Sequence, residues 1–245
     1  MGDYPIPFVV MIPERIRKNT VILYLDPDGK NVQAEQQYFY KSFLENGHIV
    51  VIPDLINTGE VGPTEYRGDA TIDGMSSNIW YMAVQNAVSM VGLRASDVNR
   101  LAGYIRQRFP EREIVGASRG DMNAVLLHAS VMNPQIKALA MLQPLISYAS
   151  IAMNPFYSME NLYSAPGGVL TAYDLPDLAA CLAPNPILML NPVDQGNQPV
   201  PLGQMNDSYA FTYAVYHDRE ADRKLTIKNN LDPPSIRTMV ANWLD

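Results

Sequence analysis

The segment Ile114-Val115-Gly116-Ala117-Ser118-Arg119-Gly120-Asp121-Met122 decides the fold class of this 245-residue chain. It contains the pattern G-x-S-x-G directly after a short apolar run and directly before an apolar stretch with helical spacing. This is the context of a nucleophile elbow, in which a tight strand-to-helix turn presents a serine hydroxyl above a sheet. A serine that only caps a helix is the alternative interpretation. We expect Ser118 to be a nucleophile and the backbone N–H of Arg119 to face a developing oxyanion.

Short apolar runs alternate with helical stretches along the whole chain. The runs are nearly all apolar, as expected for strands buried on both faces of a sheet. This alternation predicts an α/β fold with a mostly parallel central sheet and helices on both faces, whose ligands bind at the carboxyl ends of the strands. The runs cover residues 8–12, 20–25, 49–52, 113–115, 138–142, 187–190 and 224–227. The predicted helices cover residues 35–45, 76–90, 94–108 (with Asp97 expected to cap it or to pair at its start), 118–131, 175–182, 206–215 and 234–244.

The composition excludes several classes of protein. Hydrophobic residues make up 47% and charged residues 18%, which supplies a folded core and excludes a disordered chain. The net charge of −7 and the lack of a basic cluster disfavour nucleic-acid binding. No apolar run approaches the roughly 20 residues of a membrane-spanning helix. Because repeats and linker-like segments are absent, we expect a single domain over residues 1–245.

The sequence offers no pattern for a metal or a cofactor. The single cysteine, Cys181, cannot form an internal disulfide and is expected to be a small buried hydrophobe. The three histidines, His48, His128 and His217, are too scattered to make a zinc site with it. No glycine-rich phosphate loop is present. We therefore expect neither a metal nor a cofactor.

Other segments add to the elbow pattern: residues 66–69 (YRGD), 91–98, 126–129, 171–180, 183–184 and 191–194. Together, from about Val21 to the C-terminus, they resemble the acetyl xylan esterase-like hydrolases, carbohydrate esterases often encoded by gut bacteria that degrade plant polysaccharides. The resemblance implies an α/β-hydrolase fold and a plant polysaccharide or oligosaccharide as substrate. It also implies a periplasmic or extracellular location, and it leaves open that the domain belongs to a longer secreted protein.

The resemblance also implies a triad in the chain order nucleophile, acid, histidine. Asp194 follows the run 187–190 and is the candidate acid, with a turn aspartate as the alternative. The histidine belongs in the loop before the last helix, but that loop reads Lys-Asn-Asn-Leu-Asp-Pro-Pro over residues 228–234. His48 and His217 are expected near the amino ends of the strands, and His128 about 15 Å along a helix from Ser118. We therefore predict that the triad is incomplete, which leaves the serine a weak nucleophile.

The loop after the run 20–25 also departs from the family. It reads Asp26-Pro27-Asp28-Gly29, where α/β-hydrolases often carry His-Gly. A carboxylate near an oxyanion would oppose its negative charge, and Arg119 could offset that carboxylate. Glucuronoyl esterases also place an arginine after their serine, which Ser118-Arg119 partly resembles. Arg119 and Asp26 are therefore candidate oxyanion or substrate contacts, and a pairing of Arg119 with Asp121 or another carboxylate is the alternative.

These residues leave alternative functions. The first is an esterase that acts on acyl or methyl esters of plant polysaccharide through Ser118 and Asp194. The second is a catalytically impaired hydrolase-fold module that binds sugar or scaffolds a neighbouring catalytic domain. A third takes its base from a second copy of the chain or from another domain. The segment 148–163, rich in tyrosine, methionine and asparagine, is a candidate lid, with core packing or a partner interface as the alternatives.

Overall fold

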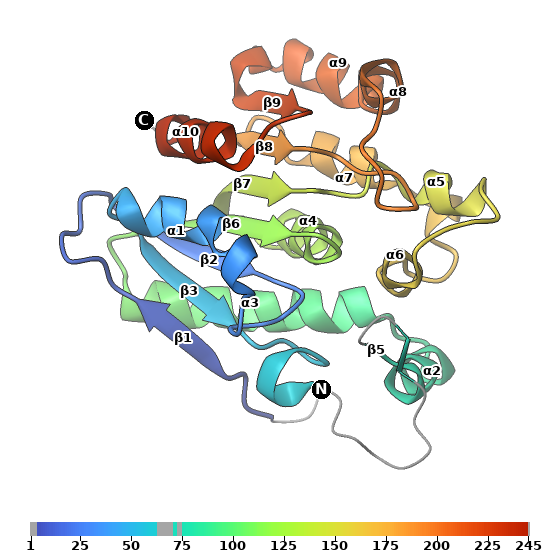
Figure 1. The fold of residues 1–245 in the computed structure, drawn as a ribbon, viewed down its shortest axis with the longest axis horizontal. Coiled ribbons are helices and arrows are strands. Elements are labelled where there is room, and N and C mark those ends of the chain that lie inside the picture. Colours follow the sequence, from blue (N-terminus) through green and yellow to red (C-terminus); the bar gives the residue numbers. More distant parts are fainter. Residues whose placement is uncertain (1–3, 63–70, 73–74, 245) are drawn as a thin grey trace.

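The computed structural model describes residues 4–62, 71–72 and 75–244, so the 66–69 motif lies outside the described residues. A seven-stranded sheet has the order β1-β3-β2-β6-β7-β8-β9 (Figure 1). Strand β1 pairs antiparallel with β3, and every other pairing in this sheet is parallel, which confirms the predicted mostly parallel sheet. The strands are β1 (Phe8–Met11), β2 (Thr20–Leu25), β3 (Ile49–Pro53), β6 (Glu113–Arg119), β7 (Ile136–Leu142), β8 (Ile187–Leu190) and β9 (Leu225–Lys228); β4 (Thr71–Ile72) and β5 (Met75–Ser76) form a separate pair.

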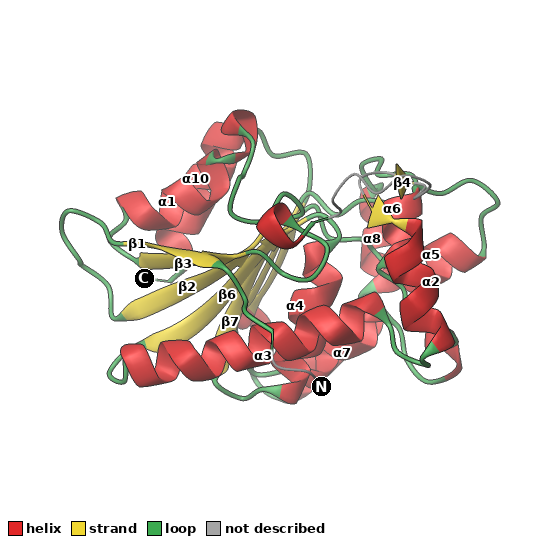
Figure 2. Cartoon of the chain, turned by 90° about the horizontal axis from the view of Figure 1, so that it is seen from below, coloured by secondary structure: helices red, strands yellow, loops and turns green. Residues whose placement is uncertain are grey.

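Helices cover both faces of the sheet (Figure 2). On one face lie α1 (Tyr38–Glu45) and α10 (Pro233–Trp243). On the other lie α3 (Met90–Arg108), α4 (Met122–Met132), α7 (Leu175–Cys181) and α9 (Ala210–Asp218). Beyond the carboxyl ends of the strands lie α2 (Ser77–Gln85), α5 (Tyr148–Ala152), α6 (Met159–Tyr163) and α8 (Leu202–Ser208).

The strands are buried on both faces, which explains their unbroken apolar sequences. In β2, the side chains of Val21 and Leu23 join the core on the α3–α4 face, and those of Ile22 and Tyr24 join the core on the α1–α10 face. All four side chains are fully buried. Within the described residues, no helix combines the length and the apolar character that a membrane crossing requires.

Several local expectations were wrong. The predicted helix over 76–90 ends at Gln85, because Ala87 turns the backbone to a positive φ of 55° and Ser89 caps the next helix by accepting from Gly92. Asp97 therefore lies inside α3 and does not cap it. It pairs instead, the alternative that the sequence left open: it accepts a hydrogen bond from Tyr4, and its Oδ1 lies 3.6 Å from Arg100 Nη1. Cys181, expected to be buried, is exposed at the end of α7.

Gly116 lies inside β6, where α4 packs closely over the sheet. A Cβ at this position would lie 2.6 Å from Leu126 Cδ1 and 3.0 Å from Leu139 Cδ2. This glycine therefore permits close packing of helix on strand and takes no part in the turn that follows the strand.

We expect Gly116→Val to lower the free energy of unfolding by about 1–3 kcal/mol, because the added methyl groups overpack this contact. The control is Gly103→Ala in α3, where a Cβ meets nothing within 4 Å. That change is expected to raise the free energy of unfolding by about 0.5–1 kcal/mol through helix propensity. Urea denaturation measures both; a neutral Gly116→Val would contradict the packing argument.

Candidate functional site

The chain reverses after β6 at Gly120, two residues beyond the serine of the elbow pattern. Ser118 is a strand residue that pairs with Met141 of β7, and it is fully buried. Gly120 follows the last strand residue and has a φ of +58°, the only positive φ among residues 113–132. The expectation that the turn presents the Ser118 hydroxyl above the sheet was therefore wrong. The left-handed turn conformation falls on the residue without a Cβ, for which it carries little steric cost.

The side chain of Asn123 holds this turn closed. Its Nδ2 donates to the carbonyl oxygens of Gly120, at 2.7 Å, and Leu142, at 2.8 Å. Its Oδ1 accepts the hydroxyl hydrogen of Ser118 at 2.6 Å. Because Asn123 and Ser118 are both buried, the Ser118 hydroxyl belongs to the internal hydrogen bonding that supports the turn.

The same backbone conformation recurs along the carboxyl edge of the sheet. Gly120, Gln143 and Asn191 directly follow β6, β7 and β8, and each has a positive φ between 52° and 58°. Each also donates its backbone N–H to the carbonyl of the last residue in the neighbouring strand, at 2.7–3.0 Å. These left-handed residues turn the chain away from the sheet at three adjacent strand ends.

An ion pair joins the strand that leads into this turn to the neighbouring strand β2. Arg119 Nε lies 3.0 Å from Asp26 Oδ2, and Arg119 Nη2 lies 2.9 Å from Asp26 Oδ1 and 3.3 Å from Asp28 Oδ2. Asp26 is buried, and its Oδ2 also accepts the Tyr24 hydroxyl at 2.6 Å. The structure thus gives Arg119 the carboxylate pairing that the sequence left as an alternative, with Asp26 and Asp28 as the partners.

Burial and the charge of Asp26 act against each other on the pKa of Arg119 and in the same direction on the pKa values of Tyr24 and Asp28. Burial alone lowers the pKa of Arg119, but the hydrogen bonds and charge of Asp26 outweigh it and raise that pKa above its ordinary value. Burial, and then the charge of Asp26, raise the pKa of Tyr24. The same two causes raise the pKa of Asp28 against the opposing charge of Arg119. Arg119 therefore stays a cation bound to its carboxylates.

Asp194 lies in the loop after β8, as its place in the chain requires. Its Oδ1 accepts the backbone N–H groups of Gly196, at 2.8 Å, and Gln198, at 2.9 Å. This is the hydrogen bonding of a turn aspartate, the alternative that the sequence left open.

The three histidines have partners of their own. His48 precedes β3, at the amino ends of the strands, and bonds to Thr20. His128 on α4 bonds to the Ala124 carbonyl at 2.7 Å and to the Tyr173 hydroxyl at 2.9 Å. His217 is exposed near the end of α9, and its Nδ1 lies 3.0 Å from Asp222 Oδ1. The loop between β9 and α10 contains no histidine, as the sequence already shows.

A polar cavity of about 670 Å³ lies at the carboxyl ends of the strands, with Gly120 in its wall. Besides Gly120, its lining includes both arginines of the region, several carboxylates and a series of amides. These residues are Asp28, Asn31, Gln33, Glu35, Gln36, Asn57, Thr58, Arg94, Arg119, Asp121, Gln143, Glu160 and Asn197. The described residues hold no cluster of three or more histidine, cysteine or acidic side chains that could bind a metal ion.

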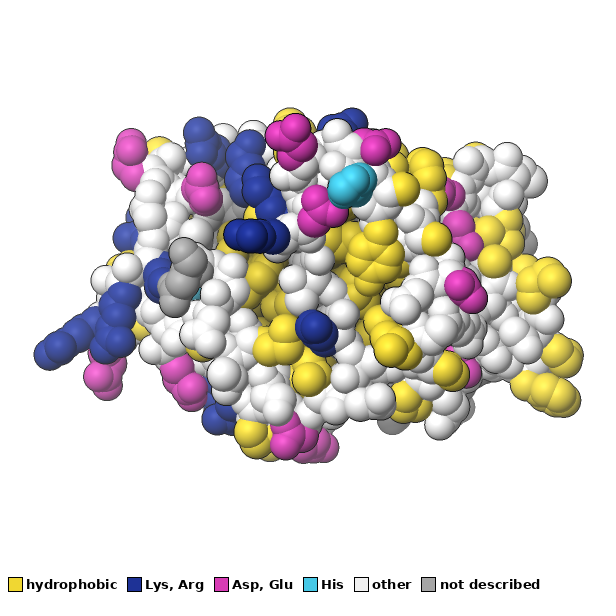
Figure 3. Space-filling view, turned by 90° about the horizontal axis from the view of Figure 1, so that it is seen from above, with side chains coloured by type: hydrophobic (Ala, Val, Ile, Leu, Met, Phe, Trp, Pro, Cys, Tyr) yellow, Lys and Arg dark blue, Asp and Glu magenta, His cyan; other side chains and the backbone are white. Residues whose placement is uncertain are grey.

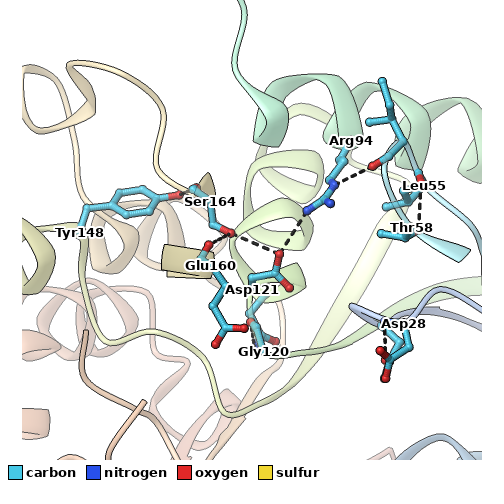
Figure 4. Close-up of polar contacts among 12 residues, drawn as sticks. Asp28, Leu55, Thr58, Arg94, Gly120, Asp121, Tyr148, Glu160 and Ser164 are labelled. Carbon is cyan, nitrogen blue, oxygen red and sulfur yellow. Dashed lines mark hydrogen bonds and ion pairs between the residues drawn. The ribbon is translucent and has the colours of Figure 1, made fainter. Parts of the chain in front are cut away.

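A second ion pair, Arg94 with Asp121, is buried in the wall of this cavity. Arg94 Nη1 lies 3.1 Å from Asp121 Oδ2, and Arg94 Nε donates to the Ile56 carbonyl at 3.0 Å. Figure 4 shows Ser164 on the other side of Asp121, with its hydroxyl 3.4 Å from the same Oδ2. Burial raises the pKa of Asp121, and the charge of Arg94 opposes that shift.

Two side chains in the cavity wall have buried polar atoms without a hydrogen-bond partner in the protein. These atoms are Asp121 Oδ1 and both Nδ2 and Oδ1 of Asn57. A buried polar atom left unpaired costs about 1–3 kcal/mol. From the sequence, Asn57 and Arg94 were given no role in the site, and Asp121 was considered only as a partner for Arg119. Arg94 lies in the 91–98 segment that carries the family resemblance, and Asp121 directly follows the G-x-S-x-G pattern, whereas no short motif marks Asn57.

Comparisons with known proteins agree with this architecture. No family model and no curated protein matches the chain. It superposes on a protein from Bacteroides fragilis assigned as an acetyl xylan esterase (TM-score 0.71, 17% identity, 91% of this chain and 62% of that one). It also superposes on a methylesterase with a TM-score of 0.67 and 14% identity, over 98% of this chain and 51% of that one. A third match is Est1E from Butyrivibrio proteoclasticus with bound ferulic acid, with a TM-score of 0.61 and 13% identity, over 98% of this chain and 94% of that one. The chain thus has the α/β-hydrolase fold, and it spans only 62% and 51% of the first two proteins.

We expect Asp26→Ala to lower the free energy of unfolding by about 3–5 kcal/mol, because it removes the carboxylate that pairs with the mostly buried Arg119. Adding Arg119→Met to this variant is expected to restore part of the loss. Urea denaturation of both single variants and the double variant gives the coupling energy. A coupling near zero would mean that the pair does not hold the two strand ends together.

Burial lowers the pKa of His128, against the opposing hydrogen bond to the Ala124 carbonyl. The unfolded chain therefore takes up this proton first, and stability falls as the pH drops below about 6.5. We expect His128→Gln to lose less stability than the wild type between about pH 7 and pH 5. His217→Gln, at an exposed histidine, should keep the acid sensitivity of the wild type. Thermal unfolding at pH 7 and at pH 5 measures the loss of stability in each protein. The same loss in the wild type and in His128→Gln would contradict the prediction.

Proposed function

We propose that this chain is an α/β-hydrolase-fold domain that binds a hydroxyl-rich ligand, a sugar or oligosaccharide, without hydrolysing an ester. The observation that carries the proposal is Gly120 at the turn between β6 and α4. In a nucleophile elbow this strained turn residue carries the attacking side chain. A glycine there supplies neither a nucleophile nor a proton to move.

Ser118 is a poor substitute for that missing side chain. Its hydroxyl is buried and donates to Asn123, and none of its hydrogen bonds goes to a histidine. A serine without a base is a weak nucleophile. The esterase alternative, with Ser118 and Asp194 in a triad, therefore needs both an exposed serine and a base from outside this chain.

The lining of the polar cavity supports a neutral, hydroxyl-bearing ligand. Asp121 Oδ1 can accept a hydrogen bond, and the Asn57 amide can both donate and accept. These atoms are buried, so a ligand reaches them only if the two side chains turn toward the cavity that they line. A pair of sugar hydroxyls offers the complementary donors and acceptor. Both arginines of the lining are already paired, Arg119 with Asp26 and Asp28, and Arg94 with Asp121. That pairing disfavours an anionic ligand.

One structural neighbour supports the same class of ligand, because it is assigned as an acetyl xylan esterase; the other, a methylesterase, is named without a sugar. Since the chain spans only part of those proteins, a role in holding substrate for a neighbouring catalytic domain belongs to this proposal. An extracellular or periplasmic setting on plant polysaccharide is its biological context.

We expect the wild type and Ser118→Ala to hydrolyse p-nitrophenyl acetate at the same background rate. The substitution should lower stability by about 1 kcal/mol through the lost bond to Asn123. The readouts are nitrophenolate release and urea denaturation. If the wild type hydrolyses the ester above background and Ser118→Ala abolishes this activity, the proposal is rejected and the esterase alternative is supported.

We expect saturable binding of xylotetraose by isothermal titration calorimetry, weakened about tenfold or more by Asn57→Ala, because two hydrogen bonds of about 1 kcal/mol each are lost. The matched amide control is Gln135→Ala, at an exposed residue that precedes β7 at the amino edge of the sheet. The control should bind as the wild type does. Equal affinity for all three proteins would show that the sugar does not occupy this cavity.

A further inference from the structure

A second cavity, of about 500 Å³, lies among the helices beyond the carboxyl ends of the strands. Its walls come from α2, the start of α3, α5, α6 and residues 165–171. Val84 and Leu170 on its rim are 52% and 44% exposed, so the cavity opens to solvent. Figure 3 shows further apolar side chains at the end of the molecule that carries α5. Its volume falls within the range of about 300–1,000 Å³ that small-molecule sites occupy.

The chemistry of this cavity differs from that of the polar one. No charged side chain is found among the described residues that line it. Three of its polar side chains already have partners: Ser89 Oγ accepts from Gly92, Thr171 donates to the Gly168 carbonyl, and Tyr148 donates to the Ser164 carbonyl. A charged ligand would lose its hydration here and find no opposite charge in the described lining.

Aromatic side chains form one wall of the cavity. The rings of Trp80 on α2 and Tyr163 on α6 lie 5.6 Å apart at 56°, a tilted arrangement of the kind that aromatic pairs prefer. Tyr148 on α5 is buried in the same lining. A ligand ring can extend this tilted packing, whereas an alkyl chain gains only the apolar contact.

Helix α6 separates the two cavities. Tyr163 faces the apolar cavity, whereas Glu160 of the same helix lines the polar one. The hydrogen bonds drawn in Figure 4 run from Tyr148 through Ser164 to Asp121, from the wall of one cavity to the wall of the other. The apolar cavity is thus a site of its own, not an extension of the cleft at Gly120.

We propose that the apolar cavity bounded by Trp80, Tyr148 and Tyr163 is a second binding site, which takes an uncharged aromatic molecule. This proposal rests on the lining of the apolar cavity and does not depend on sugar binding in the polar cavity.

The test uses N-phenyl-1-naphthylamine, an uncharged aromatic fluorophore. The chain has two tryptophans, so a Trp243→Phe background leaves Trp80 as the only tryptophan donor. Val84→Asp places a charge at the cavity rim. Met82→Asp makes the same kind of change at a 62% exposed residue of the same helix that does not line the cavity. Because both positions are exposed, both variants are expected to fold, and circular dichroism checks this.

We expect saturable quenching of Trp80 with one probe bound per chain. Val84→Asp should raise the dissociation constant about tenfold or more, and Met82→Asp less than about twofold. Xylotetraose added to the polar cavity should leave probe binding unchanged, which keeps this test separate from that of sugar binding. If the probe does not saturate, or if Val84→Asp and Met82→Asp weaken it equally, it binds general apolar surface and the proposal is overturned. The same titration in the unsubstituted chain, followed by probe emission, shows whether Trp243→Phe itself alters the result.

Discussion

The carboxyl edge of this sheet depends on the paired hydrogen bonds between Arg119 and Asp26. Arg119 is the last residue of β6, and Asp26 directly follows β2, so the ion pair joins two neighbouring parallel strands where both end. Because Asp26 is buried and Arg119 is mostly covered, neither charge can lose its partner without a large desolvation cost. The pair fixes the residue before the turn, and so fixes Gly120 in the wall of the polar cavity.

The sequence predicted the fold well and the turn poorly. Unbroken apolar runs marked the parallel strands, because burial on both faces leaves no alternation. The pattern around Ser118 correctly predicted a strand followed by a helix. It could not locate the reversal, because both Gly116 and Gly120 fit G-x-S-x-G. The end of β6 is set by distant partners, Leu142 across the sheet and Asp26 directly after β2, which no local pattern contains.

The residues that give the polar cavity its chemistry were hidden for the same reason. Arg94 and Asp121 are 27 positions apart, and Asn57 lies in a loop with no motif of its own. Only the fold brings all three into the lining of one cavity. The histidine content predicted an incomplete triad, because none of the three histidines lies in the loop before the last helix, and this stays a prediction. The proposed function extends it from the base to the nucleophile, on the observation that the turn residue is Gly120.

The central claim is that this α/β-hydrolase fold presents no nucleophile of its own at the elbow. The most direct measurement is the intact mass of the native wild-type chain after incubation with a fluorophosphonate that reacts with activated serines. We expect an unmodified mass, because the Ser118 hydroxyl is buried against Asn123 and the turn residue is a glycine. A stoichiometric adduct that peptide mapping places on Ser118 would contradict the claim.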